Sequence, residues 1–458
     1  MRTEAISINP ATGEEIACHP VLDGPAIERT VAAASAAFAG WRTTSVEVRA
    51  DAFRRLADVL ALRREALARL ITLEMGKPIR AAGAEVDKCA RLARWYADNL
   101  ADLLADETPD VDGDGKAVVS YLPLGVVLAV MPWNFPLWQV LRAAVPIVCA
   151  GNGFLLKHAD NVQGSAWALA ECFEAADFPP GLFGVVHADR ALIAGLLADP
   201  RIVGVTVTAG VTAGASLAGE AGRHVKKSLL ELGGSDPFIV LADADLDRAV
   251  AAAVEARFQN CGQVCIAAKR IIVAAPIMDA FVARFVEAAR AIRRGDPLDP
   301  ATVMGPMARV RARAELDDQV RRSVAMGARV LLGGEIPDGP GTYYPPTVLV
   351  GVTTDMPVCA EETFGPVAAI MSAAGAEDAV RIANDSVFGL SAALWTADVE
   401  AAARLAPRIE AGAVFVNGMS ASDPRVPIGG VKQSGYGREL SHFGLREFCN
   451  AQLRWVRP

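Results

Sequence analysis

Apolar residues recur at helical spacing through the first part of the chain. Between residues 26 and 77 they return every three or four positions, with arginines on the outer faces. A Gly–Pro stop at residues 76–78 ends this pattern. Residues 85–104 repeat the same amphipathic spacing. We therefore expect helices over both stretches.

The spacing changes after residue 125, where short apolar runs alternate with helical patterns. Strands that alternate with helices are typical of a parallel sheet in an α/β fold. The predicted strands form two groups, residues 126–131, 153–157, 184–187 and 202–208, and then residues 238–241, 270–273, 329–332 and 367–370.

Two stretches do not fit this alternation. Residues 106–116 are polar and rich in Gly and Asp, and the alternating run 117–122 that follows predicts a strand in an exposed hairpin. The C-terminal run 452–456 reads as a short strand with no core of its own. We expect this last strand to complete the sheet of another subunit.

Length and charge narrow the class of protein. A chain of 458 residues exceeds one compact core and predicts two or three domains, and its 52% hydrophobic content predicts a large apolar interior. The 45 basic and 53 acidic residues give a net charge of −8, without a basic run. Nucleic acid and anionic membrane surfaces are therefore not expected as partners.

The cysteines point to a reducing setting. Eight are scattered along the chain without a framework spacing, which predicts free thiols and a cytoplasmic location. The five histidines form no cluster near Cys261 and Cys265, so no metal site is expected. Residues 1–8 lack the apolar segment of a signal peptide, and the longest apolar run, residues 143–156, is too short to span a bilayer.

Three motifs carry candidate chemistry. Cys265 ends the run RFQNCGQVC (257–265), Glu231 begins ELGG (231–234) and Asn134 lies within PWNFP (132–136). Singly, each has a simpler explanation: a small buried cysteine, a solvated carboxylate, a turn between prolines. Together they supply a nucleophile, a base that activates water and an oxyanion donor, as acyl transfer through a thioester requires.

These motifs, with EETFGPV (361–367), resemble the aldehyde dehydrogenase superfamily over essentially the whole chain, beginning at NPATG (9–13). The stretches MPWNFPLWQVLRAAVPI, LELGGSDPFIVLADADLD and GGVKQSGYGRELSHFG, with His158, look like the bacterial succinate-semialdehyde dehydrogenases. The resemblance implies an aldehyde dehydrogenase-like α/β fold with two Rossmann-like parallel domains and a small β oligomerisation arm.

The same resemblance implies domain boundaries. Residues 1–109 and 124–232 would form a dinucleotide-binding domain and residues 233–428 a catalytic domain. Residues 110–123 and 429–458 would form the oligomerisation arm and a C-terminal strand. The expected active unit is a homodimer or homotetramer.

Roles follow from the resemblance for the three catalytic candidates. The Cys265 thiolate would add to an aldehyde, and the Asn134 amide would hold the oxyanion. Glu231 would activate the water that releases the acid. Because a free thiol has a pKa of about 8.5, Cys265 needs local activation.

Cofactor contacts are carried over in the same way. Lys157 and Asp160 would grip the adenosine ribose, and Glu362 the nicotinamide ribose. A carboxylate at Asp160 repels a 2′-phosphate, so NAD is the expected cofactor, although Lys157 keeps NADP possible. Ala209 and Gly210 depart from the family's Thr-Gly-Ser, which predicts weakened or re-angled dinucleotide binding. The remaining expected contacts are Trp133, Asn134, Leu232 and Phe364, the last equally explained as core.

The substrate contacts are Arg142, Trp138 and Arg425. Arg142 matches the arginine that binds a distal carboxylate in succinate-semialdehyde dehydrogenases, and Arg425 would be a second anchor. Gln259 stands where some members add an arginine, which leaves other aldehydes open: glutarate semialdehyde, or an aromatic or aliphatic aldehyde beside Trp138. Glu231 argues against a CoA-acylating enzyme, and the complete catalytic set against a non-catalytic binding protein. Cys261 is either a small packed residue or a disulfide partner for Cys265.

Overall fold

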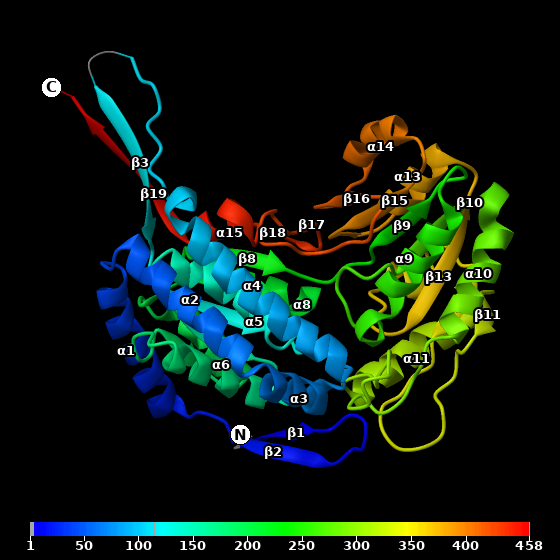
Figure 1. Ribbon diagram of the computed structural model, residues 1–458, viewed down its shortest axis with the longest axis horizontal. Coiled ribbons are helices and arrows are strands. Elements are labelled where there is room, and N and C mark those ends of the chain that lie inside the picture. The colour runs from blue at the N-terminus through cyan, green and yellow to red at the C-terminus, as the bar shows by residue number, and fades with distance from the viewer. Residues whose placement is uncertain (1–3, 113–114, 458) are drawn as a thin grey trace.

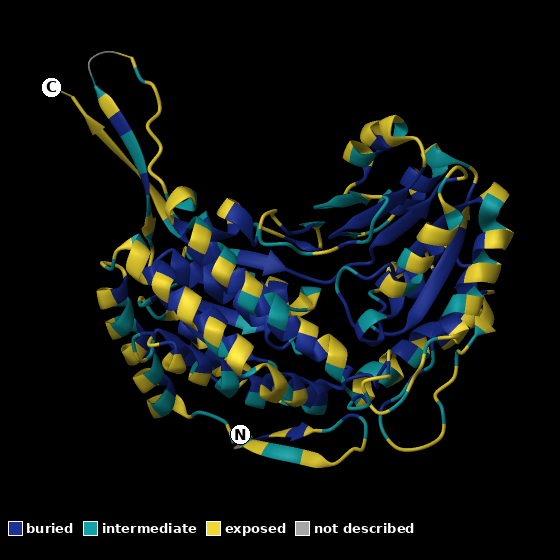
Figure 2. Cartoon of the chain, viewed as in Figure 1, coloured by how far each residue is buried: buried dark blue, intermediate teal, exposed yellow. Residues whose placement is uncertain are grey.

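Two parallel sheets, each covered by helices, make up most of the molecule. The computed structural model describes residues 4–112 and 115–457. In Figure 1 the helices of the N-terminal half surround one sheet and those of the C-terminal half surround the other. Figure 2 shows most strands of both sheets as buried and the outer faces of the helices as exposed.

The first sheet has the strand order β18-β8-β7-β4-β5-β6. Its strands run parallel except β18, which pairs antiparallel with β8. Because helices cover both faces, the strands read as continuous apolar runs rather than as alternating ones. Their bounds are β4 Val126–Met131, β5 Gly153–His158, β6 Phe183–Val185, β7 Ile202–Thr208, β8 Lys227–Glu231 and β18 Gly435–Tyr436.

The helices around this sheet confirm the predicted helical region and divide it. A turn at residues 42–45 separates the first two helices, and the Ser45 side chain caps the second. Helices α4 and α5 carry residues of the site. The bounds are α1 Gly24–Trp41, α2 Val46–Leu62, α3 Arg64–Met75, α4 Ile79–Leu103, α5 Trp138–Cys149, α6 Gln163–Ala175, α7 Arg190–Gly195, α8 Val211–Arg223 and α15 Ser441–Arg446.

The second sheet has the order β11-β12-β13-β10-β9-β15-β16, with only β11 antiparallel to its neighbour. It contains all four of the later predicted strands, and sequence reasoning missed β12, β15 and β16. The strands are β9 Pro237–Val240, β10 Arg270–Ala274, β11 Arg329–Leu332, β12 Thr347–Val350, β13 Val367–Ala373, β15 Ala392–Trp395 and β16 Val414–Val416. The helices are α9 Leu246–Phe258, α10 Met278–Arg290, α11 Val310–Ala325, α12 Pro357–Ala360, α13 Ala376–Asn384 and α14 Val399–Leu405.

Three two-stranded ribbons complete the fold. β1 (Glu4–Ile8) pairs with β2 (Glu15–Pro20), and β14 (Phe388–Gly389) with β17 (Val431–Lys432). The third joins β3 (Lys116–Pro123) to β19 (Cys449–Val456) and projects from the body (Figure 1). The C-terminal strand therefore pairs with β3 of its own chain, which sequence reasoning did not predict, and its contact with another subunit stays a prediction. Part of the predicted polar loop, residues 113–114, and the first three residues lie outside the described residues.

The predicted fold class is confirmed by the two parallel sheets with helices on both faces and the projecting ribbon. The exact domain boundaries stay a prediction. Among residues 4–112 and 115–457, the helices lack the combined length and apolarity of a membrane span.

Candidate active site

One pocket gathers residues from all four motifs. It lies where the carboxyl ends of β4, β7 and β8 meet the loop before β10, and its volume is about 200 Å³. The carboxyl ends of parallel strands are the usual place for a site in open α/β sheets. The lining residues are Pro132, Trp133, Asn134, Gln139, Thr208, Ala209, Gly210, Glu231, Leu232, Gly233, Cys265, Glu362 and Phe364.

The loop before Cys265 is held in an unusual backbone conformation. Asn260, Cys261 and Gly262 are consecutive residues with φ of 50°, 55° and 69°. A β-carbon at Gly262 would lie 2.3 Å from the main-chain oxygen of Gly365, so only glycine fits there. Such a left-handed run is strained and persists only where the surroundings fix it.

Asn134 is fixed by reciprocal hydrogen bonds with this loop. Its Nδ2 donates to the carbonyl oxygen of Gln263 at 3.0 Å, and Asn260 Nδ2 donates to the carbonyl oxygen of Asn134 at 2.8 Å. One Asn134 amide hydrogen therefore stays available, because Nδ2 carries two. The side chain is buried and lines the pocket. This arrangement suits an oxyanion donor whose position is set before substrate binds.

Glu231 ends β8 and is 2% exposed. Burial raises the pKa of its carboxyl to about 7, against the opposing pull of Arg142, whose Nη2 lies 3.7 Å from Oε2. Oε1 has no hydrogen-bond partner among the described residues. A carboxylate with a pKa near neutrality and an open oxygen is well suited to take a proton from water.

Cys265 is half-buried and its thiol is free. Burial raises the pKa of the thiol to about 11, although the Arg142 and Lys269 charges favour the thiolate. The positive charges that we expected near the thiol are thus present, but burial raises the thiol pKa by more than these charges lower it. A proton acceptor must therefore take part when Cys265 reacts.

Sequence reasoning missed two buried cations that hold the site together. Lys269 Nζ donates to the carbonyl oxygen of Cys265 at 2.9 Å and to Glu362 Oε1 at 2.8 Å. Arg257 Nη2 donates to the carbonyl oxygens of Thr363 and Gly365. Both cations tie the cysteine loop to the EETFGPV segment. The sequence offered one indication for Lys269, because this charged residue directly precedes the apolar strand β10.

A third missed residue is Glu439, in the GRELSHFG stretch. It forms a buried ion pair with Arg142, which is 2% exposed. Arg142 lies on α5 as expected, but its guanidinium faces Glu439 and Glu231 and does not line the pocket. Its role as a carboxylate anchor stays a prediction.

The other two expected substrate contacts lie apart from the pocket lining. Arg425 is exposed and is held by Asp423, with Nε 2.7 Å from Oδ1. Trp138 is buried at the start of α5, where the ring faces the ammonium of Lys88 at 3.9 Å. Neither residue is among those that line the Cys265 pocket.

The expected adenosine-ribose contacts are adjacent. Lys157 Nζ donates to Asp160 Oδ1 at 2.8 Å, and His187 Nε2 lies 3.6 Å from the same oxygen. His187 and Lys157 together hold the pKa of Asp160 well below its usual range. Arg309 lies nearby and donates to Asn161. The Asp160 charge is therefore already balanced by cations.

The backbone at the start of α8 also fits a dinucleotide. Gly210 precedes α8 with an extended backbone and no side-chain cap, and a β-carbon there would meet no atom within 4 Å. Thr208 Oγ1 is buried and has no hydrogen-bond partner among the described residues. A helix N-terminus with open space and an unused donor suits a pyrophosphate.

Glu362 and Phe364 also line the pocket. Glu362 Oε1 accepts from the main-chain nitrogen of Gly234 at 3.1 Å, and Phe364 packs edge-on against Trp133 at 5.7 Å. Phe364 lines the pocket with Leu232, so it is not simply core. Their contacts to the cofactor stay predictions.

Cys261 belongs to the core of the second sheet and is 2% exposed. The cations that act on its thiol are Arg257 and Arg294, whereas those that act on Cys265 are Arg142 and Lys269. The two thiols are both free and have different neighbours. The packed-residue explanation therefore fits better than a disulfide.

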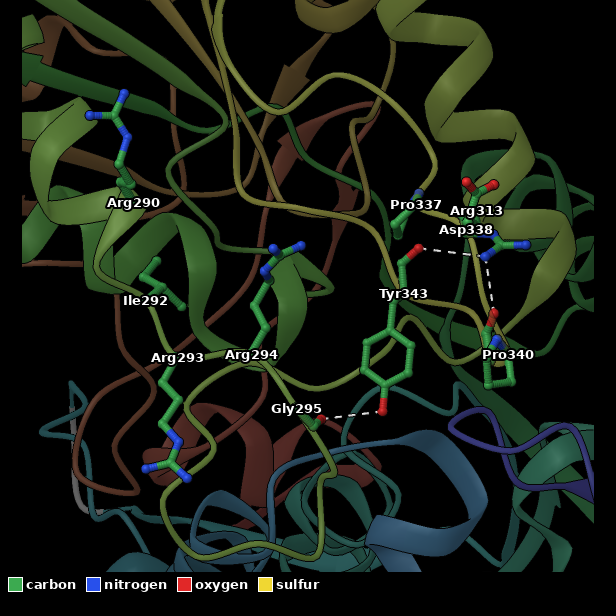
Figure 3. Close-up of a pocket in the computed structure, with 11 residues that line it drawn as sticks. Arg290, Ile292, Arg293, Arg294, Gly295, Arg313, Pro337, Asp338, Pro340 and Tyr343 are labelled. Carbon is green, nitrogen blue, oxygen red and sulfur yellow. Dashed lines mark hydrogen bonds between the residues drawn. The ribbon is translucent and has the colours of Figure 1, made fainter.

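A larger cavity of about 480 Å³ lies elsewhere and is lined by arginines (Figure 3). Its guanidinium groups lie apart in the figure, and Arg313 donates to the carbonyl oxygens of Gly341 and Tyr343. Among the described residues, its lining contains no cysteine. The Cys265 pocket is therefore the better candidate for catalysis. Among the described residues, no group of three potential metal ligands is present.

Comparison with known proteins agrees with this geometry. The model of the aldehyde dehydrogenase family matches residues 2–453. The succinate semialdehyde dehydrogenase (NAD(P)+) Sad of Escherichia coli (strain K12) is 54% identical over 453 residues, covering 99% of this chain and 98% of that protein. The succinate-semialdehyde dehydrogenase (NADP(+)) 1 of Mycobacterium ulcerans (strain Agy99) is 49% identical, covering 98% of each.

The solved structures give the same picture. The succinic semialdehyde dehydrogenase from Streptococcus pyogenes, in complex with NADP+ as the cofactor, superposes with a TM-score of 0.97 at 35% identity, covering 99% of this chain and 100% of that one. These relatives are named for NADP or for both cofactors, so the expected preference for NAD is not supported. With a match that extends over nearly all its residues, this chain belongs to the aldehyde dehydrogenase family.

Proposed function

We propose that this enzyme oxidises succinate semialdehyde, or a similar small semialdehyde, to the dicarboxylic acid with a nicotinamide dinucleotide. The observation that carries the chemistry is the meeting of Cys265, Glu231 and Asn134 in one pocket. The substrate rests on the relatives, which are named for succinate semialdehyde. The cations around α5 support it, because they suit an anionic aldehyde.

The residues divide the reaction into two stages. Once the Cys265 thiol has given its proton to a base, its sulfur bonds to the aldehyde carbon, and the Asn134 amide stabilises the resulting oxyanion, a contribution of about 3–4 kcal/mol for one such donor. A bound nicotinamide dinucleotide would accept the hydride that leaves this carbon, so that a thioester remains on Cys265. Glu231 then takes a proton from a water molecule whose oxygen attacks the thioester, and the C–S bond breaks as the sulfur regains a proton and the acid is released.

The finer cofactor assignment is use of NADP+, with NAD+ as a second cofactor. Lys157 offsets the charge of Asp160, and Arg309 adds a further cation beside it. A 2′-phosphate is drawn to such a surplus of positive charge. The names of the relatives support the same assignment.

The direct test follows reduced-cofactor absorbance with succinate semialdehyde, using NADP+ and NAD+ in turn. Cys265→Ser should abolish turnover, while Cys18→Ser, a matched change at an exposed thiol, should leave it intact. Product analysis with and without CoA separates hydrolysis from CoA acylation. A wild type that forms no dicarboxylate, or a Cys265→Ser variant with full activity, would refute the proposal.

We also infer that the active unit is a dimer or tetramer in the cytoplasm. The projecting ribbon supports this, because β19 exposes Leu453, Trp455 and Val456. Exposed apolar side chains on a ribbon mark a contact surface. Sedimentation of wild type and of Trp455→Ser would test it, with dissociation expected for the variant.

A further inference from the structure

Lys269 is a buried cation whose three ammonium hydrogens are all used. Its side chain is 0% exposed. The ammonium donates to the main-chain oxygen of Gly234 at 2.5 Å, to that of Cys265 at 2.9 Å and to Glu362 Oε1 at 2.8 Å. Because an ammonium carries three donors, none is left for a bound molecule. Lys269 can therefore act on a ligand only through the residues that it holds.

The three acceptors belong to three different motifs. Gly234 ends ELGG (231–234), Cys265 ends GQVC (262–265) and Glu362 lies in EETFGPV (361–367). A buried ammonium is costly unless charged and polar partners compensate, and here one carboxylate and two carbonyl oxygens do so. One side chain thus fixes the relative positions of three segments that are distant in the sequence.

The two oxygens of the Glu362 carboxylate have different surroundings. In the described part of the chain, both hydrogen bonds that the carboxylate accepts go to Oε1, from Lys269 and from the main-chain nitrogen of Gly234. Oε2 lies against Gly233, where a β-carbon would be 2.3 Å away from it. Glu362 and Gly233 both line the Cys265 pocket. The two bonds to Oε1 therefore orient the carboxylate and leave Oε2 for a ligand hydroxyl.

The same ammonium anchors the nucleophile. The loop at residues 260–262 has a strained left-handed backbone that persists only where its surroundings fix it. The bond from Lys269 to the Cys265 carbonyl oxygen fixes the end of this loop. The Lys269 charge also favours the thiolate and so lowers the pKa of the Cys265 thiol, against the effect of burial.

We propose that Lys269 is a positioning residue, whose single ammonium orients Glu362 for the nicotinamide ribose and holds the Cys265 main chain for attack on the aldehyde. This inference rests on the proposed function, through the expected contact between Glu362 and the dinucleotide. It gives the nucleophile and the cofactor-binding carboxylate one common anchor. Lys269 itself touches neither cofactor nor substrate.

The first test measures cofactor binding without aldehyde. Lys269→Met keeps the length of the side chain and removes its charge and its donors. Fluorescence titration should show that Kd for NADP+ rises about tenfold, as for the loss of one hydrogen bond. Lys269→Gln keeps an amide donor and should lose less affinity.

A double-mutant cycle with Glu362→Gln shows whether Lys269 acts through that carboxylate. Glu362→Gln should also raise Kd for NADP+. The double variant Lys269→Met/Glu362→Gln should bind no more weakly than the weaker single variant, because the second change removes nothing further. Two independent effects would instead multiply.

Alkylation of Cys265 by iodoacetamide, followed by mass spectrometry on cofactor-free enzyme, tests the second contact. Lys269→Met should raise the thiol pKa, so the rate between about pH 8 and 10 should fall about tenfold for each unit of that rise. Glu362→Gln should not slow alkylation, because the Glu362 charge raises the same pKa. A merely structural lysine would not produce this contrast.

Lys432→Met is the matched control. Lys432 Nζ donates to the main-chain oxygens of Asn384 and Ser386, each at 3.0 Å, and pairs with Glu410 at 2.5 Å. It thus contacts two carbonyl oxygens and one carboxylate, as Lys269 does, but it does not line the Cys265 pocket. Its removal should leave Kd and the alkylation rate within about twofold, because it reaches neither group.

The outcomes separate the two proposals. If the wild type binds neither NADP+ nor NAD+, the proposed function is wrong. If the wild type binds NADP+ and the Lys269 variants bind it equally well, or alkylate at the wild-type rate, the function stands and the Lys269 assignment is overturned. Multiplied effects in the double variant, or Lys269 variants that show no cooperative thermal melt, would make Lys269 structural and also overturn it.

Discussion

Arg142 Nη2 lies 3.7 Å from Oε2 of Glu231, and both side chains are 2% exposed. The guanidinium is shared with Glu439, so one positive charge faces two buried carboxyls. Burial favours the neutral form of Glu231 and Arg142 favours the ionised form. Together these effects place the pKa of the proposed base near neutrality, so that Glu231 can both accept and release a proton.

Replacing the base should separate the two stages of the reaction. In Glu231→Gln, Cys265 still adds to the aldehyde, but water attack on the thioester loses its proton acceptor. We expect a burst of reduced cofactor close to one per site, followed by turnover about 10²- to 10⁴-fold slower. Rapid mixing with absorbance detection measures both phases. Loss of the burst itself would show that Glu231 acts before the thioester forms.

Hydrolysis should depend on pH through Glu231. Its pKa is raised to about 7, so the ionised fraction falls about tenfold per pH unit well below 7 and is complete well above it. The rate of the hydrolytic stage should therefore rise with pH and level off above about 7. Steady-state kcat between pH 5.5 and 9 checks this where hydrolysis limits turnover.

Removing Arg142 should move that profile. Because Arg142 lowers the pKa of Glu231, Arg142→Leu should raise it, so that activity lost at pH 6.5 returns in part at pH 9. Arg142→Lys keeps the charge and serves as the control. A profile that stays in place for Arg142→Leu would contradict this electrostatic coupling.

Gly262→Ala should disable the nucleophile. The added methyl group meets the Gly365 carbonyl oxygen at 2.3 Å, and φ of 69° disfavours any β-carbon. We expect activity to fall at least about 100-fold, as for displaced catalytic geometry. Gly219→Ala, in open space on a helix, is the control. Titration of accessible thiols on folded protein would show whether Cys265 has moved.

Gly210→Ser should strengthen cofactor binding. The position has room for a side chain and lies at the N-cap of α8, where a serine hydroxyl is favoured. We expect the dinucleotide Kd to fall about two- to tenfold, roughly one hydrogen bond. Fluorescence titration with NADP+ measures it, and an unchanged Kd would place the pyrophosphate elsewhere.

Asp160→Asn should increase the preference for NADP+. The substitution removes the carboxylate charge that Lys157 and Arg309 now face. The ratio of kcat/KM for NADP+ to that for NAD+ should rise about tenfold, and Lys157→Met should lower it. If both variants change the ratio in the same direction, this corner does not bind the 2′-phosphate.

Most strands of the two sheets were predictable because each is a local apolar run that helices cover on both faces, whereas β12, β15 and β16 were missed. The candidate site was predictable because the motifs contain Cys265, Glu231 and Asn134, and the fold brings these three residues to one pocket. Lys269 and Glu439 were not, because their meaning lies in contacts across distant segments: Glu439 meets Arg142 some three hundred residues away. The pairing of β19 with β3 was missed for the same reason.

Glu85 Oε1 accepts hydrogen bonds from the main-chain nitrogens of Leu137 and Trp138 and so clamps α4 against the first turn of α5. This contact has a consequence for redesign of the enzyme. It makes the two helices beside the pocket a rigid frame, whereas the nucleophile depends on a crowded loop that tolerates no added atoms. Chemistry and substrate choice are thus encoded in separable parts of the chain. An engineer seeking a new aldehyde should vary Gln139, which lies on α5 and lines the pocket, and keep residues 260–265 untouched.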